Sequence, residues 1–139
     1  TRDKFDSVEL YLTVTGSSIE MGDEGFVGRG NRGNGIINMT KGYSMEGACG
    51  KNPVYHVGFI YTECAHRIAK KIYEKTNLAT QVFITSQSGR SLADPKDVTI
   101  VLEKDKKYNA EDLKKIVFEE LNQIPLITKD FLEGYVNLY

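Results

Sequence analysis

The most regular pattern in the chain predicts an amphipathic helix that begins at residue 53. Asn52 supplies an N-cap, and Pro53 occupies the first helical position, where its missing N–H is not needed. Apolar residues then recur at intervals of three and four, which predicts a single buried face. That face comprises Val57, Ile60, Tyr61, Cys64, Ala65, Ile68, Ala69, Ile72 and Tyr73. Tyr55 and Phe59 fall on the outer side, where aromatic residues are typical of interfaces between proteins.

Alternation of apolar and polar residues predicts strands on both sides of this helix. Segments with a strand-like pattern cover residues 8–14, 35–39, 80–85, 97–102 and, as an edge strand, 135–139. A loop containing Gly89 and the pair Asp94-Pro95 joins the third and fourth segments. Such a loop would make those two strands antiparallel neighbours.

Two further helices are predicted in the last third of the chain. Asn109 caps the first, which ends before Pro125. Thr128 caps a second, short helix, and Gly134 stops it. The order of elements is β-(β)-α-β-β-α-(α)-β. This order predicts an α+β fold in which helices cover one face of a mixed or antiparallel sheet, because isolated strands need such cover.

Glycine is concentrated in the first part of the chain, where a Gly-rich stretch runs from about residue 16 to residue 50. Loops of this length are usually functional or disordered. Residues 28–33 spell G-x-G-x-x-G, but they lead into a strand-like segment, which excludes the dinucleotide-binding motif. Gly50-Lys51 is not the end of a phosphate-binding P-loop, since Met45 stands where that motif needs its first glycine.

The Gly-rich stretch nevertheless predicts an anion site. Residues 47–51 lead directly into a helix N-terminus, where N–H groups and the positive end of the helix dipole attract anions, and Lys51 adds a full positive charge. Arg29 and Arg32 lie among glycines, and their guanidinium groups suit phosphate oxygens. Together these basic residues indicate one polyphosphate site, whereas each arginine taken alone could be a solvated loop residue.

Other polar residues allow more than one interpretation. Asp23 and Glu24 could bind a metal ion or sugar hydroxyls, or shape a turn, and the turn is favoured. His56, in the first turn of the predicted helix, could face the same anion or lie on the surface. The sequence shows no spacing for a metal centre or a Ser/His/Asp arrangement, so nucleophilic catalysis by this chain is not supported.

Composition and charge narrow the class of protein. The 139 residues fit one domain, and 40% hydrophobic and 27% charged residues exclude a disordered or fibrous chain. A net charge of −1 gives no field that would attract nucleic acid or an anionic membrane. Two cysteines and the lack of a long apolar run predict a reducing, cytoplasmic location.

Two segments resemble a known family. Residues 22–32 (GDEGFVGRGNR) and 44–58 (SMEGACGKNPVYHVG) are similar to archaeal-type S-adenosylmethionine synthetases, also called methionine adenosyltransferases. The resemblance covers nearly the whole chain, which would correspond to the C-terminal third of such a protein. It implies Gly-rich active-site loops at 16–52, a helix-and-sheet unit at 53–139 and a fold like one of the family's three similar α+β units.

The resemblance implies a reaction in which the methionine sulfur attacks C5′ of ATP and displaces triphosphate, which is then hydrolysed to pyrophosphate and phosphate. Mg²⁺, and often K⁺, assists, with most metal ligands outside this chain. A homodimer or higher homo-oligomer is implied, and the chain would be inactive alone. Lys51 and Arg29 match polyphosphate contacts and are the catalytic candidates. The substrate-binding candidates are Asp23, Arg32, Gly50, Asn52 and His56.

An alternative hypothesis is a non-catalytic binding or assembly module whose Gly/Arg loop contacts RNA or a protein partner. The near-neutral charge and the single Gly-Arg-Gly at residues 28–30 make this alternative weaker than the synthetase hypothesis. Salt-dependent RNA binding that is lost on substitution of Arg29 and Arg32 would support this alternative.

Overall fold

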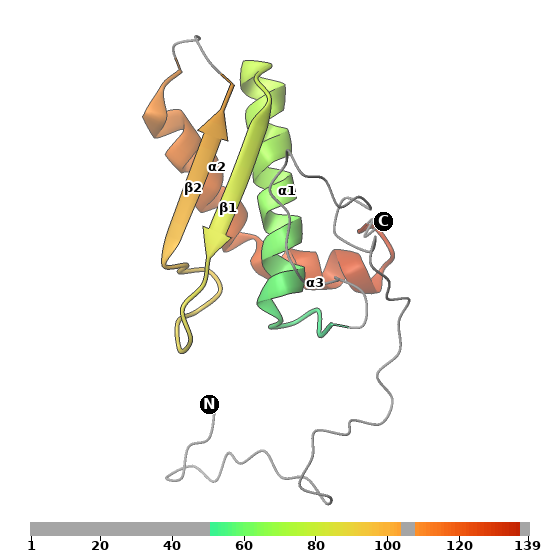
Figure 1. Ribbon diagram of the computed structural model, residues 1–139. Coiled ribbons are helices and arrows are strands. Elements are labelled where there is room, and N and C mark those ends of the chain that lie inside the picture. The colour runs from blue at the N-terminus through green and yellow to red at the C-terminus, as the bar shows by residue number, and fades with distance from the viewer. Residues whose placement is uncertain (1–50, 104–107, 137–139) are drawn as a thin grey trace, which may run out of the picture.

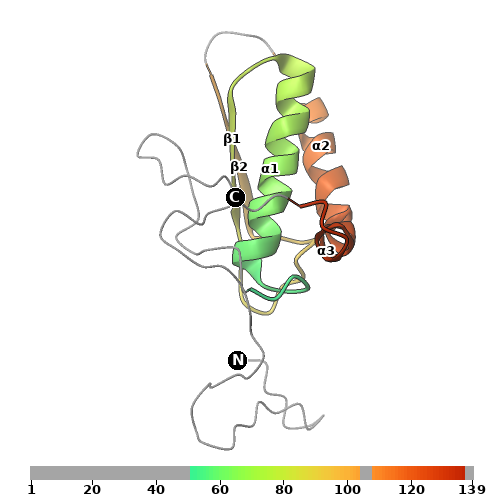
Figure 2. The same ribbon diagram turned by 90° about the vertical axis from the view of Figure 1, so that its right-hand side faces the viewer.

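Two layers make up the part of the chain that the computed structural model describes, residues 51–103 and 108–136. In chain order the elements are α1 (Val57–Thr76), β1 (Thr80–Thr85), β2 (Asp97–Leu102), α2 (Ala110–Asn122) and α3 (Ile124–Leu132). The strands form one layer, and α1 and α2 lie along one of its faces, while α3 lies beside the start of α1 (Figures 1 and 2). The predicted α+β class is confirmed, and the strands predicted at 8–14 and 35–39 lie outside the described residues.

The strand predictions at 80–85 and 97–102 are confirmed to the residue. β1 and β2 pair antiparallel, with Thr80 opposite Leu102 and Thr85 opposite Asp97. Their alternation turns one set of side chains toward the helices, because successive residues of a strand point to opposite faces. The side chains that pack against the core from the strands are Val82, Ile84, Val98, Ile100 and Leu102. Phe83 and Val101, on the other face, are exposed.

The core lies between this sheet face and the three helices. Its largest fully buried side chains are Phe59, Ile60, Ile68, Ile72, Ile127 and Cys64. The placement of Phe59 on the outer side of α1 is therefore wrong. Its ring meets that of Phe131 edge to face, with centroids 4.7 Å apart and an interplanar angle of 81°. Because α3 covers this side of α1, the buried surface extends beyond the single stripe that the sequence predicts.

Two residues of α1 that the periodicity predicts to be buried are exposed, one in the first turn of the helix and one in the last. Val57 and Tyr73, which the periodicity places on the buried face, are 39% and 52% exposed. Phe59 is covered by α3, and Tyr61 is covered by the loop after β1. The hydroxyl of Tyr61 donates to the carbonyl oxygen of Leu92 in that loop at 3.0 Å.

The first helix begins at Val57, four residues later than predicted. The backbone N–H of Val54 donates to Oδ1 of Asn52 at 2.8 Å, so this asparagine closes a local turn instead of capping the helix. His56 takes the N-cap position in an extended conformation. An asparagine followed by proline is compatible with both arrangements.

The caps of the later helices follow the prediction in two of three cases. Oδ1 of Asn109 accepts from the N–H of Glu111 at 3.0 Å and begins α2. Gly134, with φ +79°, ends α3; its N–H donates to Phe131 and that of Tyr135 to Asp130, the two bonds of a Schellman motif.

Thr128, predicted as a helix cap, instead lies inside α3, which begins at Ile124 with proline in its first turn. The predicted edge strand at 135–139 is wrong at Tyr135 and Val136, which have no strand structure, and its remainder lies outside the described residues.

Ion pairs connect α1 to its two helical neighbours. Nε of Arg67 lies 2.7 Å from Oε1 of Glu63 in the same helix, and Nη2 of Arg67 lies 2.8 Å from Oδ2 of Asp130 in α3. Lys71 forms an ion pair with the buried carboxylate of Glu120 in α2, and this hydrogen bond raises the pKa of the Lys71 ammonium. A buried carboxylate needs such a partner, so removal of Lys71 alone would leave Glu120 with a large desolvation penalty.

We expect the thiol of Cys64 to be unreactive in the folded protein. Burial raises its pKa from the usual 9.0 to about 12, and thiolate is the reactive form. Peptide-resolved alkylation by iodoacetamide at pH 8.5 should label Cys64 at least several hundredfold more slowly in the folded protein than in urea, because the thiolate fraction is smaller by roughly that factor. Equal rates in the two conditions would contradict the burial of this side chain.

The same pKa shift makes the stability of the fold depend on pH in the alkaline range. Because the folded thiol holds its proton up to about pH 12 while the unfolded thiol loses it near 9.0, unfolding releases a proton between those values. Stability is therefore unaffected by this group below pH 9 and falls as the pH rises toward 12.

Candidate functional site

The segment that leads into α1 forms a well-defined turn. Besides the bond from Val54 to the side chain of Asn52, the N–H of His56 donates to the carbonyl oxygen of Asn52 at 3.2 Å. The hydroxyl of Thr128 in α3 donates to the carbonyl oxygen of Pro53 at 2.7 Å. The turn is thus closed by its own hydrogen bonds and is attached to α3. Residues 51–56 are called the α1 entry turn below.

Electrostatics at the end of this turn favour an anion. The first turn of α1, which the structure describes in full, contains no acidic residue. The N–H groups of Phe59 and Ile60 both donate to the carbonyl of His56 at 3.0 Å, as at a regular helix start. The positive end of the helix dipole is therefore not compensated by a carboxylate within that turn, and Lys51 precedes it in the entry turn.

Three of the predicted site residues share the α1 entry turn. Lys51 and His56 are half-buried, and Asn52 is exposed. Asn52 uses its side-chain oxygen to close the turn, and His56 caps α1 through its backbone. The other predicted residues, Asp23, Arg29, Arg32 and Gly50, lie outside the described residues, so their roles remain predictions.

Sequence reasoning missed one residue of this region. Thr128 contacts the entry turn from a position 75 residues away in the chain. No local signal marks this contact, because a threonine followed by a few apolar residues is equally typical of a helix cap. Only the docking of α3 beside α1 brings the hydroxyl to Pro53.

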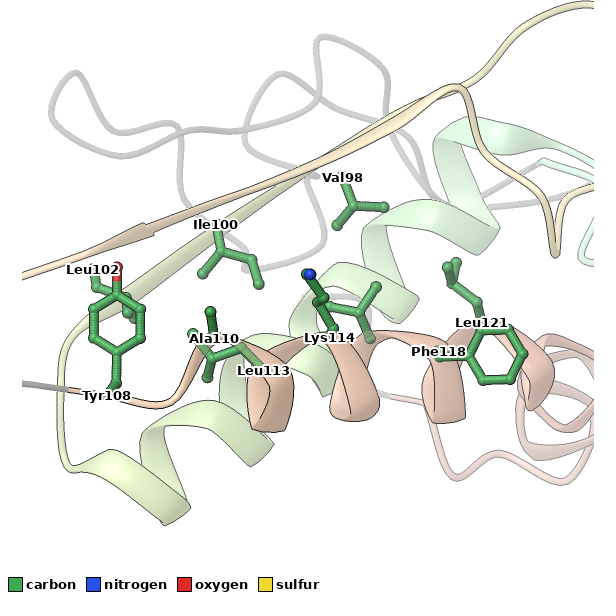
Figure 3. A pocket seen from close by; sticks show the side chains of 10 residues that line it. Val98, Ile100, Leu102, Tyr108, Ala110, Leu113, Lys114, Phe118 and Leu121 are labelled. Atoms are coloured by element: carbon green, nitrogen blue, oxygen red, sulfur yellow. The ribbon is translucent and has the colours of Figure 1, made fainter.

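A groove among the described residues lies elsewhere, between β2 and α2. It has a volume of about 450 Å³. Figure 3 shows Val98, Ile100 and Leu102 of β2 facing the side chains of α2, among them Leu113 and Phe118. The ammonium of Lys114 at its rim lies 2.8 Å from the carboxylate of Glu111. An apolar groove with one such cation does not suit a polyphosphate, so the entry turn is the better candidate site.

Metal ligands do not gather in the described part of the chain. Within residues 51–103 and 108–136 there is no group of three or more His, Cys, Asp or Glu side chains that could hold a metal ion. In the same residues no helix is both long enough and apolar enough to cross a membrane.

Comparison with known proteins gives the family. A model of the family described as S-adenosylmethionine synthetase (AdoMet synthetase) matches residues 1–135. The chain belongs to the S-adenosylmethionine synthetase family. The match spans both the Gly-rich stretch and the helix-and-sheet unit, including the α1 entry turn.

Individual members of the S-adenosylmethionine synthetase family are similar over the whole chain. It is 43% identical to the S-adenosylmethionine synthase of Pyrobaculum aerophilum over 142 aligned positions, which cover 99% of this chain and 35% of the relative. The corresponding enzyme of Hyperthermus butylicus is 42% identical, covering 100% of this chain and 36% of the relative. The probable S-adenosylmethionine synthase of Aquifex aeolicus is 40% identical, and the match covers 95% of this chain and 34% of the relative. The chain therefore spans about a third of the length of these S-adenosylmethionine synthetases.

Proposed function

We propose that this chain is the C-terminal part of a longer polypeptide that makes S-adenosylmethionine from ATP and L-methionine. The observation that carries the proposal is the family match over residues 1–135. The share of about 35% of each relative supports a contribution to a larger enzyme. In this proposal the chain supplies part of the ATP site and is inactive alone.

The reaction in this proposal is a displacement at carbon. The methionine sulfur forms a bond to C5′ of ATP while the bond from C5′ to the triphosphate oxygen breaks, and the electron pair leaves with the triphosphate. Negative charge grows on that leaving group in the transition state. Cations placed in advance stabilise this charge more than they stabilise bound ATP, which lowers the barrier.

The α1 entry turn would supply part of that positive environment. Lys51 brings an ammonium group, and the first turn of α1 adds N–H dipoles without an opposing carboxylate. Arg29 and Arg32 would add guanidinium groups from the Gly-rich stretch, and Asp23 would approach methionine or the nucleoside. Gly50 would allow close approach of the backbone to the phosphates, and His56 lies at the helix start.

Other components would come from outside this chain. Mg²⁺, with K⁺ as a further cation, would offset phosphate charge when bound, and its ligands are expected mostly in the preceding part of the polypeptide. The enzyme would act in the cytoplasm as a homodimer or higher homo-oligomer.

The test is the reaction of the full-length polypeptide with ATP, L-methionine and Mg²⁺. We expect S-adenosylmethionine, pyrophosphate and phosphate in equal amounts, resolved by chromatography. A parallel reaction without methionine controls for hydrolysis of ATP alone. Release of phosphate without formation of S-adenosylmethionine would contradict the proposed function.

A further inference from the structure

Helix α3 is attached to α1 and to its entry turn through contacts of different kinds. The Thr128 hydroxyl donates to Pro53 at 2.7 Å, the ring of Phe131 packs on that of Phe59, and Asp130 pairs with Arg67 at 2.8 Å. The aromatic and ionic contacts join α3 to the body of α1. The hydrogen bond from Thr128 alone among these three reaches the turn itself.

The geometry of Thr128 is unusual for a threonine inside a helix. Such hydroxyls commonly bond to a carbonyl of their own helix four residues back, as Thr62 does with Gly58 at 2.7 Å and Thr76 with Ile72 at 2.8 Å. Thr128 instead bonds across 75 residues to a carbonyl outside any helix. The bond is partly buried, which makes its loss more costly than that of an exposed one.

The bond from Thr128 reaches the turn beside the hydrogen bonds that the turn makes internally. Within the turn, Oδ1 of Asn52 accepts from the N–H of Val54, and the carbonyl oxygen of Asn52 accepts from the N–H of His56. The carbonyl oxygen of Pro53, the next residue, accepts from the Thr128 hydroxyl. The backbone between Lys51 and α1 is thereby attached to α3. The residue that attaches it, Thr128, is far from the candidate anion site in the sequence.

We propose that Thr128 is a positioning residue that holds the α1 entry turn so that Lys51 meets the polyphosphate of ATP. The proposal rests on the function proposed above. It extends that function to α3, whose hydroxyl sets the position of a cation on another element. Displacement of a cation by about 1 Å is enough to lower a rate substantially, because stabilisation depends on placement in advance.

The first measurement follows the turn itself in the full-length polypeptide. Thr128→Val removes the donor and keeps the shape of the side chain. We expect the amide hydrogens of Val54 and His56 to exchange about fivefold faster or more, as loss of one partly buried hydrogen bond implies. Thr128→Ser keeps the hydroxyl and should restore slow exchange. If the valine variant does not fold, Thr128→Ala serves as the second variant.

The second measurement asks whether the turn acts through Lys51. In Thr128→Val we expect kcat/KM for ATP to fall about fivefold or more, with recovery in Thr128→Ser. In a Lys51→Ala background, Thr128→Val should lower kcat/KM for ATP no further, because the effects of two residues that act as one unit are not additive. Thr62→Val is the matched control, since it removes a hydroxyl bonded within its own helix, and should leave both measurements unchanged.

The outcomes separate the two proposals. Unchanged exchange in Thr128→Val would overturn the positioning role and leave the proposed function standing. Faster exchange with an additive loss in the Lys51→Ala background would also overturn it, because Thr128 would then act on stability alone. Wild-type turnover in Lys51→Ala by itself would overturn the role of Lys51 in the proposed function, whatever Thr128 does.

Discussion

Replacement of Lys51 by alanine in the full-length polypeptide is expected to lower kcat/KM for ATP by at least tenfold. The substitution removes a cation from the α1 entry turn, where the positive end of α1 is not opposed by an acidic residue of its first turn. Loss of a group placed in advance against developing charge commonly costs a factor of about ten to a thousand. Most of the loss should appear in kcat, because leaving-group charge is larger in the transition state than in bound ATP.

The matched control for this prediction is Lys70→Ala. Lys70 lies on the exposed side of α1, so its removal takes away the same charge at a different place. The kcat/KM of the Lys70→Ala variant for ATP is expected to stay within about twofold of wild type. Arg29→Ala, in the Gly-rich stretch, should repeat the tenfold loss. Unchanged kinetics in both Lys51→Ala and Arg29→Ala would end the assignment of roles to these residues.

Phe59→Ala should have the largest effect on stability. The Phe59 side chain is fully buried and packs edge to face on Phe131, so its truncation removes apolar burial and leaves a cavity between α1 and α3. Truncations of this kind cost about 3 to 5 kcal/mol. Native-state hydrogen exchange of α1 amides in the full-length polypeptide should report this loss as a lower free energy of opening.

Phe118→Ala is the control for that measurement, because Phe118 is the same residue type but 68% exposed. Its expected cost is less than about 1 kcal/mol. If Phe59→Ala destabilised α1 no more than Phe118→Ala, the packing of α3 over the start of α1 would be wrong. The attachment of the entry turn to α3 would then lose its physical basis as well.

The sequence was sufficient where the signal is local. Alternation at residues 80–85 and 97–102 placed both strands correctly, because side chains that point alternately to the two faces of a strand leave their pattern within the segment itself. Asn109 and Gly134 were correct for the same reason: a cap is made by a side chain or a backbone conformation within a few residues of the helix end.

The sequence was insufficient where contacts between distant residues decide. Asn52-Pro53 can begin a helix or close a turn, and the structure adopts the turn, which Thr128 holds from α3. Phe59 is buried because α3 covers it, which the spacing of apolar residues along α1 cannot reveal. Of the candidate site, the structure describes only Lys51, Asn52 and His56, which share one turn, and the roles of all the site residues stay predictions.

The most direct measurement is a crystal structure of the full-length assembly with a non-hydrolysable ATP analogue. We expect the ammonium of Lys51 and the guanidinium of Arg29 to lie within hydrogen-bond reach, about 3 Å, of phosphate oxygens of the analogue. The entry turn should remain bonded to Thr128 in that complex. An analogue bound elsewhere, with both cations directed into bulk solvent, would contradict the proposed polyphosphate site.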